Sequence, residues 1–157
     1  MQTYTIAFFG HRQIDDIFIV EKRLTELIEK RLAEKEYVEF LVGRNGDFDR
    51  YVSSVIRTVQ KRHGSANSAH VLVLPYITAE YRHNMESFHA YYDEIEIFDA
   101  FPHFKNAITK RNHTMIDRAE EVIFWLEKES GGSYEAYCYA KKQKKKIKNI
   151  ANAREKT

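Results

Sequence analysis

Residues 122–133 are the most informative stretch of this chain: the apolar run Val122-Ile123-Phe124-Trp125-Leu126 leads to Ser130-Gly131-Gly132-Ser133, and a helical pattern begins near Tyr134. A buried strand that ends in two glycines before a helix leaves free backbone N–H groups at the positive end of the helix dipole. Such a helix end binds anions, phosphate above all. Gly131 and Gly132 allow positive φ and the close approach of a ligand, and Ser133 can cap the helix or donate its hydroxyl to an oxyanion. The alternative interpretation is an ordinary turn with capping chemistry.

A second glycine turn follows the first predicted strand. Residues 4–9 are β-rich and nearly all apolar, as expected of a strand covered on both faces. This strand runs directly into Gly10-His11-Arg12, where the glycine permits a sharp exit and the next two side chains bring hydrogen-bond donors. Ligands of open parallel sheets bind at such carboxyl ends. His11 also has a simpler interpretation, as a turn residue with a local hydrogen bond.

Composition predicts one domain over residues 1–157. The chain has 157 residues, 43% of them hydrophobic, which is enough for a real core without a second domain. Its 25 Lys and Arg against 23 Asp and Glu give a net charge of +2, so no strong overall field points to DNA. The single cysteine, Cys138, excludes an intramolecular disulfide and is expected to be a small packing residue of a helix.

No targeting or membrane segment stands out. The amino end lacks the charged and apolar pattern of a signal peptide, and no apolar run approaches the length of a membrane span. We therefore expect a soluble, cytoplasmic protein without a membrane partner.

Apolar β-like runs alternate with longer amphipathic stretches, which is typical of βαβ units around a parallel sheet. The pattern predicts an α/β protein: a Rossmann-like three-layer sandwich with a mainly parallel sheet. Strands are expected at 4–9, 37–42, 70–74, 94–98, 122–126 and, as a short edge strand, 147–150. Helices are expected from 17 to 32, after Asp47 and Asp49, and over 79–92, 104–118 and 134–145.

Three predicted strands end in polar turns: Gly10-His11-Arg12, Gly43-Arg44-Asn45-Gly46-Asp47 and Ser130-Gly131-Gly132-Ser133. Because a parallel sheet places these ends at one edge, the loops are expected to meet in one cleft. Gly43 and Gly46 supply a flexible turn. Asp47 either caps the following helix or accepts a hydrogen bond from a ribose hydroxyl.

The chain resembles the SLOG superfamily of Rossmann-like proteins, and within it the small bacterial YpsA-like branch. The matching segments, in chain order, are Gly10-His11-Arg12, Gly43 to Asp47, Lys110-Arg111-Asn112 with Met115, Asp117 and Ala119, and Gly131-Gly132-Ser133 with Ala136 and Ala140. The resemblance implies a pocket at the sheet edge for a nucleotide or a nucleotide-derived, ADP-ribose-like ligand, and it assigns Arg111 and Asn112 to that pocket. Without the resemblance, Arg111 and Arg118 would be interpreted as part of a solvated helix face.

Related SLOG proteins include the LOG-type phosphoribohydrolases, which cleave the base from a nucleoside monophosphate. Their glycine turn is similar, but here the glycine-threonine pair is missing and the position of the catalytic glutamate is aromatic or thiol. This departure argues against transferring the hydrolase activity. His11, Asp47 and Glu135 remain the candidates for an acid or base if the protein turns over a nucleotide.

Other clusters give weaker indications. The histidine pairs His83/His89 and His103/His113 lack metal-ligand spacing, so we predict no metal and no resident cofactor. The lysines of the basic end, residues 141–157, complement a helix carboxyl terminus, and RNA binding is the less favoured interpretation. The aromatic residues near the third strand end form either a base-stacking wall or core: Tyr76, Tyr81, Phe88, Tyr91 and Tyr92.

The leading hypothesis is a binding protein or sensor for a nucleotide-derived ligand; homo-oligomer formation stays open.

Overall fold

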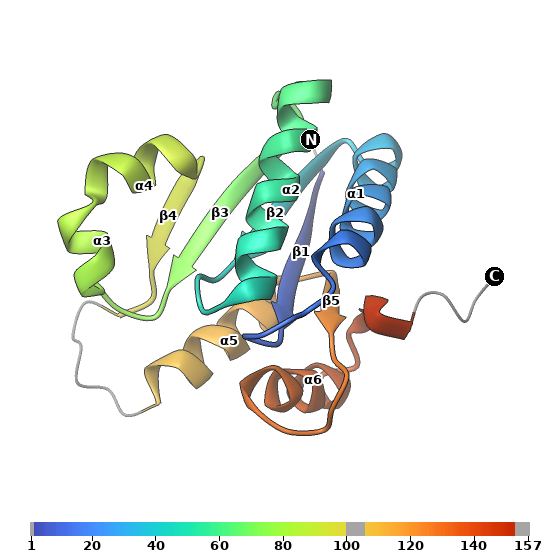
Figure 1. Cartoon of the computed structure of the whole chain (residues 1–157), viewed down its shortest axis with the longest axis vertical. Helices are drawn as coiled ribbons and strands as arrows, with labels where there is room; N and C mark the ends of the chain where they lie inside the picture. Colours follow the sequence, from blue (N-terminus) through green and yellow to red (C-terminus); the bar gives the residue numbers. More distant parts are fainter. Residues whose placement is uncertain (1, 100–105, 153–157) are drawn as a thin grey trace.

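A six-stranded parallel sheet organises the chain, with helices on both faces (Figure 1). The computed structural model describes residues 2–99 and 106–152. Its strands are β1 (Thr3–Gly10), β2 (Tyr37–Val42), β3 (Ser68–Leu74), β4 (Glu94–Ile97), β5 (Glu121–Trp125) and β6 (Lys146–Asn149). They lie in the order β4-β3-β2-β1-β5-β6. The predicted Rossmann-like three-layer sandwich is therefore confirmed, including the short edge strand near residue 147.

The helices are α1 (Ile17–Glu34), α2 (Asp47–His63), α3 (Ala79–His83), α4 (Met85–Tyr91), α5 (Ala107–Arg118) and α6 (Gly132–Lys142). Most predicted boundaries agree within a few residues, but the single helix predicted over 79–92 is wrong. It is two helices because Asn84 has non-helical φ −139° and ψ 33°, and its side-chain amide donates to the Glu80 carbonyl at 2.8 Å. The predicted start of the next helix, at residue 104, lies outside the described residues.

The last long helix also differs from its prediction. It begins at Gly132 and ends at Lys142, whereas the pattern predicted residues 134–145. Lys144 follows with φ 57°, a left-handed conformation that ends the helix and turns the chain toward β6.

Each face of the sheet has its own apolar core, and β1 belongs to both. Ile6 and Phe8 pack into the core beneath α1 and α2, whereas Ala7 and Phe9 pack into the core beneath α5 and α6. Successive side chains of a strand point to opposite faces, so a central strand covered on both sides must be apolar throughout. This is the physical origin of the uninterrupted apolar run near the amino end.

A buried ion pair ties α1 to β5 at the amino end of the sheet. Arg31 donates from Nε and Nη2 to both carboxylate oxygens of Glu121, each at 2.8 Å, and the Tyr4 hydroxyl donates to the same carboxylate at 2.9 Å. Glu121 is fully buried. Burial raises the pKa of Glu121, but the hydrogen bonds from Arg31 and Tyr4 outweigh that effect and leave the pKa below its usual value.

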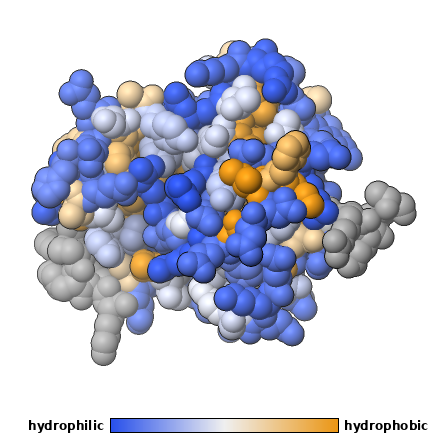
Figure 2. All heavy atoms as spheres, in the orientation of Figure 1, coloured by the Kyte–Doolittle hydropathy of each residue, from blue (hydrophilic) through white to orange (hydrophobic). Residues whose placement is uncertain are grey.

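The outer surface is mostly polar, with apolar atoms gathered over the start of α1 (Figure 2). The exposed apolar side chains there are Ile17, Phe18 and Ile19. Among the described residues, no helix is long and apolar enough to cross a membrane.

Candidate functional site

A cleft of about 760 Å³ opens where the strand order reverses, at the carboxyl ends of β1 and β5. Helices α1 and α2 follow one face of the sheet and α5 and α6 the other, so the loops after these two strands part from each other and leave a crevice. We call it the switch-point cleft. Its lining includes eight of the predicted ligand-binding residues: Gly10, His11, Arg12, Arg111, Asn112, Gly131, Gly132 and Ser133.

Two predicted residues do not line this cleft. Gly43 lines a neighbouring cavity instead. Asp47 is directed at the connection between β1 and α1: its carboxylate accepts from the Ile14 amide at 3.0 Å and also pairs with Arg50. The backbone hydrogen bond from Ile14 and then the Arg50 contact lower the pKa of Asp47. This carboxylate therefore organises the β1–α1 connection and is not presented to a ligand in the cleft.

His11 joins the two loops of the cleft. Its Nε2 accepts a hydrogen bond from the Glu127 amide at 2.8 Å, and its side chain is buried. Burial, and next the positive charge of Lys128, lower the pKa of His11. The ring is consequently neutral near pH 7, with the nitrogen that would accept a substrate proton already occupied.

Glu135, the remaining acid-base candidate, lies outside the lining of the cleft. Its carboxylate contacts Nε2 of His113 at 3.0 Å on the exposed side of α5 and α6. The ring of His113 in turn stacks on Tyr139, with 3.7 Å between the ring centroids. Glu135 thus belongs to a surface contact between two helices.

The glycine turn differs in detail from its prediction. Gly131 is the N-cap of α6 with φ 94°, whereas Gly132 is already helical and does not use positive φ. Within the described residues, no side chain caps this helix, so the first-turn amides of Gly132, Ser133 and Tyr134 have no hydrogen-bond partner, whereas the Glu135 amide donates to the Gly131 carbonyl. Ser133 lines the cleft but does not cap the helix, because its hydroxyl donates to the Gly10 carbonyl at 2.6 Å.

Arg111 is the buried cation of the cleft. Only 3% of it is exposed, and it donates from Nε to Asn112 Oδ1 at 2.9 Å and from Nη1 to the Val73 carbonyl at 2.7 Å. Among the described residues, no carboxylate lies within 4.0 Å of its guanidinium. Burial lowers the pKa of Arg111, and the charge of Asp49 opposes this effect. The solvated-face interpretation is therefore wrong for Arg111.

Arg118, on the same helix, has a different role. It pairs with Glu96 at 2.6 Å and with Glu39 at 3.3 Å, so it links α5 to β4 and β2. The spacing of the two arginines placed them on one helical face, but only one of them reaches the cleft.

Asp49 is a site residue that the sequence interpretation placed only at the start of a helix. It lines both the switch-point cleft and the neighbouring cavity. Its carboxylate accepts from the Asn45 amide at 2.8 Å, and burial raises its pKa. The signal available in the sequence was a second aspartate directly after the glycine-rich turn.

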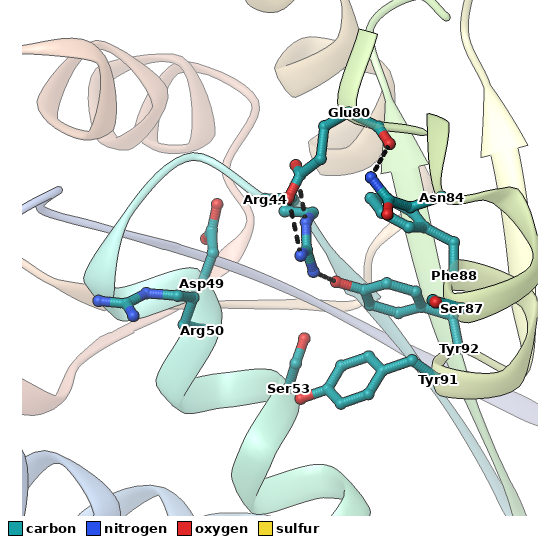
Figure 3. A pocket seen from close by; sticks show the side chains of 11 residues that line it. Arg44, Asp49, Arg50, Ser53, Glu80, Asn84, Ser87, Phe88, Tyr91 and Tyr92 are labelled. Atoms are coloured by element: carbon teal, nitrogen blue, oxygen red, sulfur yellow. Dashed lines mark hydrogen bonds and ion pairs between the residues drawn. The ribbon is translucent and has the colours of Figure 1, made fainter. Parts of the chain in front are cut away.

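The neighbouring cavity, of about 470 Å³, lies against α2, α3 and α4 (Figure 3). We call it the aromatic cavity because Phe88, Tyr91 and Tyr92 form its wall. Phe88 and Tyr92 are only 4% exposed and belong to the core, so the core interpretation of this aromatic cluster is confirmed for them. Tyr81, by contrast, is core only and does not line the cavity.

The basic end is partly structural. Lys145 donates from Nζ to the carbonyls of Asp117 and Ala119 at 3.0 and 2.9 Å, so it satisfies the last turn of α5.

Cys138 is exposed, which corrects the expectation of a packing residue. Among residues 2–99 and 106–152, no group of three potential metal ligands comes together; His103, one of the histidines considered, lies outside that part of the chain.

Comparison with known proteins gives a relationship at the level of the fold. No protein family and no curated protein sequence matches the chain. Its structure is similar to that of DNA processing protein A from Helicobacter pylori, a protein with a described mode of binding single-stranded DNA. The TM-score is 0.66 at 14% sequence identity, and the match covers 96% of this chain and 70% of that one. The two chains share a fold.

Proposed function

We propose that this protein binds a nucleotide-derived ligand through a phosphate group held in the switch-point cleft. The observation that carries the proposal is the buried Arg111 guanidinium, which has no carboxylate partner among the described residues. Asp49 acts on Arg111 through its charge but forms no ion pair with it within 4.0 Å, so this buried cation has no contact partner of opposite charge among the described residues, which is unfavourable. An anionic ligand in the same cleft would supply that contact.

The rest of the cleft fits the same ligand chemistry. The unpaired first-turn amides of α6 present hydrogen-bond donors at the positive end of a helix dipole. Arg12 and Lys128 add exposed cations to the lining. Buried Arg111 provides a fixed donor group, and the exposed cations attract the ligand from solvent.

The YpsA-like SLOG resemblance supports the proposal at a finer level. Its motif segments after β1, on α5 and at the start of α6 all contribute residues to this cleft. A nucleotide or an ADP-ribose-like compound is the ligand class that this resemblance implies.

We favour binding over turnover. The proposed acid-base candidates are either occupied or outside the cleft: His11 accepts from a backbone amide, Asp47 holds the β1–α1 connection, and Glu135 lies between two helices. Asp49 lines the cleft and its charge acts on Arg111, so Asp49→Asn is the variant that tests turnover. If the wild type releases base or phosphate and Asp49→Asn does not, the proposed function changes from binding to catalysis.

Calorimetric titration with AMP, NAD and ADP-ribose tests the proposal. Arg111→Met should weaken binding at least about tenfold, because a charge-assisted contact to phosphate is lost. Arg118→Met, on the same helix but outside the cleft, is the matched control. Lys128→Ala, at an exposed position, should weaken binding without affecting folding. Equal affinities in wild type, Arg111→Met and Lys128→Ala would overturn the proposal.

Single-stranded nucleic acid is the second candidate, favoured by the shared fold with DNA processing protein A and by exposed Arg12 and Lys128. A fluorescent oligo-dT titrated at several salt concentrations tests it. If the cleft binds the strand, Lys128→Ala should reduce the salt slope by about one phosphate contact. An unchanged slope, or binding of AMP that oligo-dT does not displace, would exclude this candidate.

A further inference from the structure

We propose that the aromatic cavity receives the base of the same ligand, so that the protein selects nucleotides over sugar phosphates and other small phosphates. This inference rests on the proposed phosphate site in the switch-point cleft. It assigns the phosphate to Arg111 and α6, and the base to the wall formed by Phe88, Tyr91 and Tyr92.

The two cavities adjoin. Asp49 lines both, and Gly43 lies between the Asp49 carboxylate and the Arg111 guanidinium. A Cβ at Gly43 would lie 3.0 Å from Asp49 Oδ2 and 3.3 Å from Arg111 Nη1. Glycine avoids this tight contact, and no positive φ is involved. Because Gly43 has no side chain, none stands between the two cavities at this position, and one ligand can reach both.

The cavity has the size and composition of a site for a planar ring. Its volume of about 470 Å³ lies within the range of small-molecule sites, whereas packed interiors contain few voids larger than a water molecule. Tyr91 and Tyr92 pack edge to face with ring centroids 4.9 Å apart, and Phe88 and Tyr92 lie 6.0 Å apart. These mutual contacts fix the orientation of the wall before any ligand enters.

Arg44 supplies a second planar surface. It donates to both carboxylate oxygens of Glu80, each at 3.0 Å, and from Nη1 to the Tyr92 hydroxyl at 2.8 Å. Its guanidinium lies 4.5 Å from the centroid of the Phe88 ring. Figure 3 shows this side chain held between Glu80 and Tyr92 at the cavity. Aromatic rings and guanidinium planes are the groups on which proteins stack bases.

The test compares AMP with ribose 5-phosphate, which carries the phosphate and sugar but no base. Ser87 is exposed on α4 and lines the cavity, so Ser87→Trp should fill the cavity without disturbing the core. Ala90→Trp is the matched control, because Ala90 is exposed on the same helix and does not line the cavity. Arg111→Met reports on the phosphate site.

The wild type should bind AMP about tenfold or more tightly than ribose 5-phosphate. Ser87→Trp should remove that difference while leaving the affinity for ribose 5-phosphate unchanged, and Ala90→Trp should behave as wild type. Equal binding of AMP and ribose 5-phosphate by the wild type, or equal AMP affinity in both tryptophan variants, would overturn this inference while the phosphate site stands. Unchanged binding of both probes in Arg111→Met would overturn the phosphate site instead, and no binding of either probe would overturn both.

Discussion

The Ser133 hydroxyl donates to the Gly10 carbonyl at 2.6 Å and so joins the first turn of α6 to the end of β1. These residues lie 123 positions apart in the sequence. The bond fixes the helix end against the strand, with the free amides of α6 on the switch-point cleft. In the proposed function these amides and Arg111 bind the phosphate, and the serine holds the helix in position.

Ser133→Ala should lower the free energy of unfolding by about 1 kcal/mol, the usual contribution of one such hydrogen bond. Urea unfolding measures the difference. Ser130→Ala, in the exposed loop before the same helix, is the control and should unfold like the wild type. Identical unfolding midpoints for the two variants would show that the Ser133 bond contributes nothing.

Gly131 and Gly132 should respond differently to alanine. Gly131 has φ 94°, which an L side chain rarely adopts, so Gly131→Ala should cost about 1–3 kcal/mol of stability. Gly132 has ordinary helical φ, and a Cβ there meets no heavy atom within 4 Å, so Gly132→Ala should be tolerated. Thermal unfolding of the two variants tests this expectation. A loss of stability confined to Gly132→Ala would contradict the assignment of Gly131 as the strained position.

Acid should destabilise the protein through His70. The side chain is fully buried, and burial lowers its pKa from 6.5 to about 4, although the charge of Asp93 opposes this. Between these values the unfolded state binds the extra proton. Neutral His70 therefore causes no loss of stability above about pH 6.5. As the pH approaches 4, the free energy of unfolding falls by about 3 kcal/mol.

Urea unfolding across this pH range measures the effect. His70→Gln should flatten the dependence, whereas His83→Gln, at an exposed position of α3, should retain it. If the free energy of unfolding of His70→Gln still falls with pH as in the wild type, the acid sensitivity comes from other groups.

Breaking the buried pair of Arg31 and Glu121 should be severe. Glu121→Gln leaves the Arg31 guanidinium without its bidentate partner, which typically costs about 3–5 kcal/mol. Replacing both residues, as Arg31→Met with Glu121→Leu, should recover much of this loss, because no buried charge remains. A double variant less stable than Glu121→Gln would show that the pair itself stabilises the fold.

Local sequence patterns were enough to predict the layers of the sheet and most of the chain segments that line the candidate site. The apolar run of β1 indicated a central strand because period-two alternation is absent when both faces are covered. The turns after β1 and β5 could be located because glycine and polar residues interrupt apolar runs, which is a local signal. The break at Asn84 was missed because it depends on one side chain donating to a nearby carbonyl, which periodicity does not record.

Only the tertiary structure decided which polar groups are free for a ligand. Ser133 and His11 were predicted to face the ligand, yet Gly10 and Glu127 take their hydrogen bonds. Arg111 and Arg118 share a helix, but one is buried without a carboxylate partner among the described residues while the other pairs with two glutamates. The physical reason is that strand and helix patterns depend on neighbours along the chain. The partner of a polar group, in contrast, often comes from an element that is distant in the sequence and becomes its neighbour only when the strands and helices pack together.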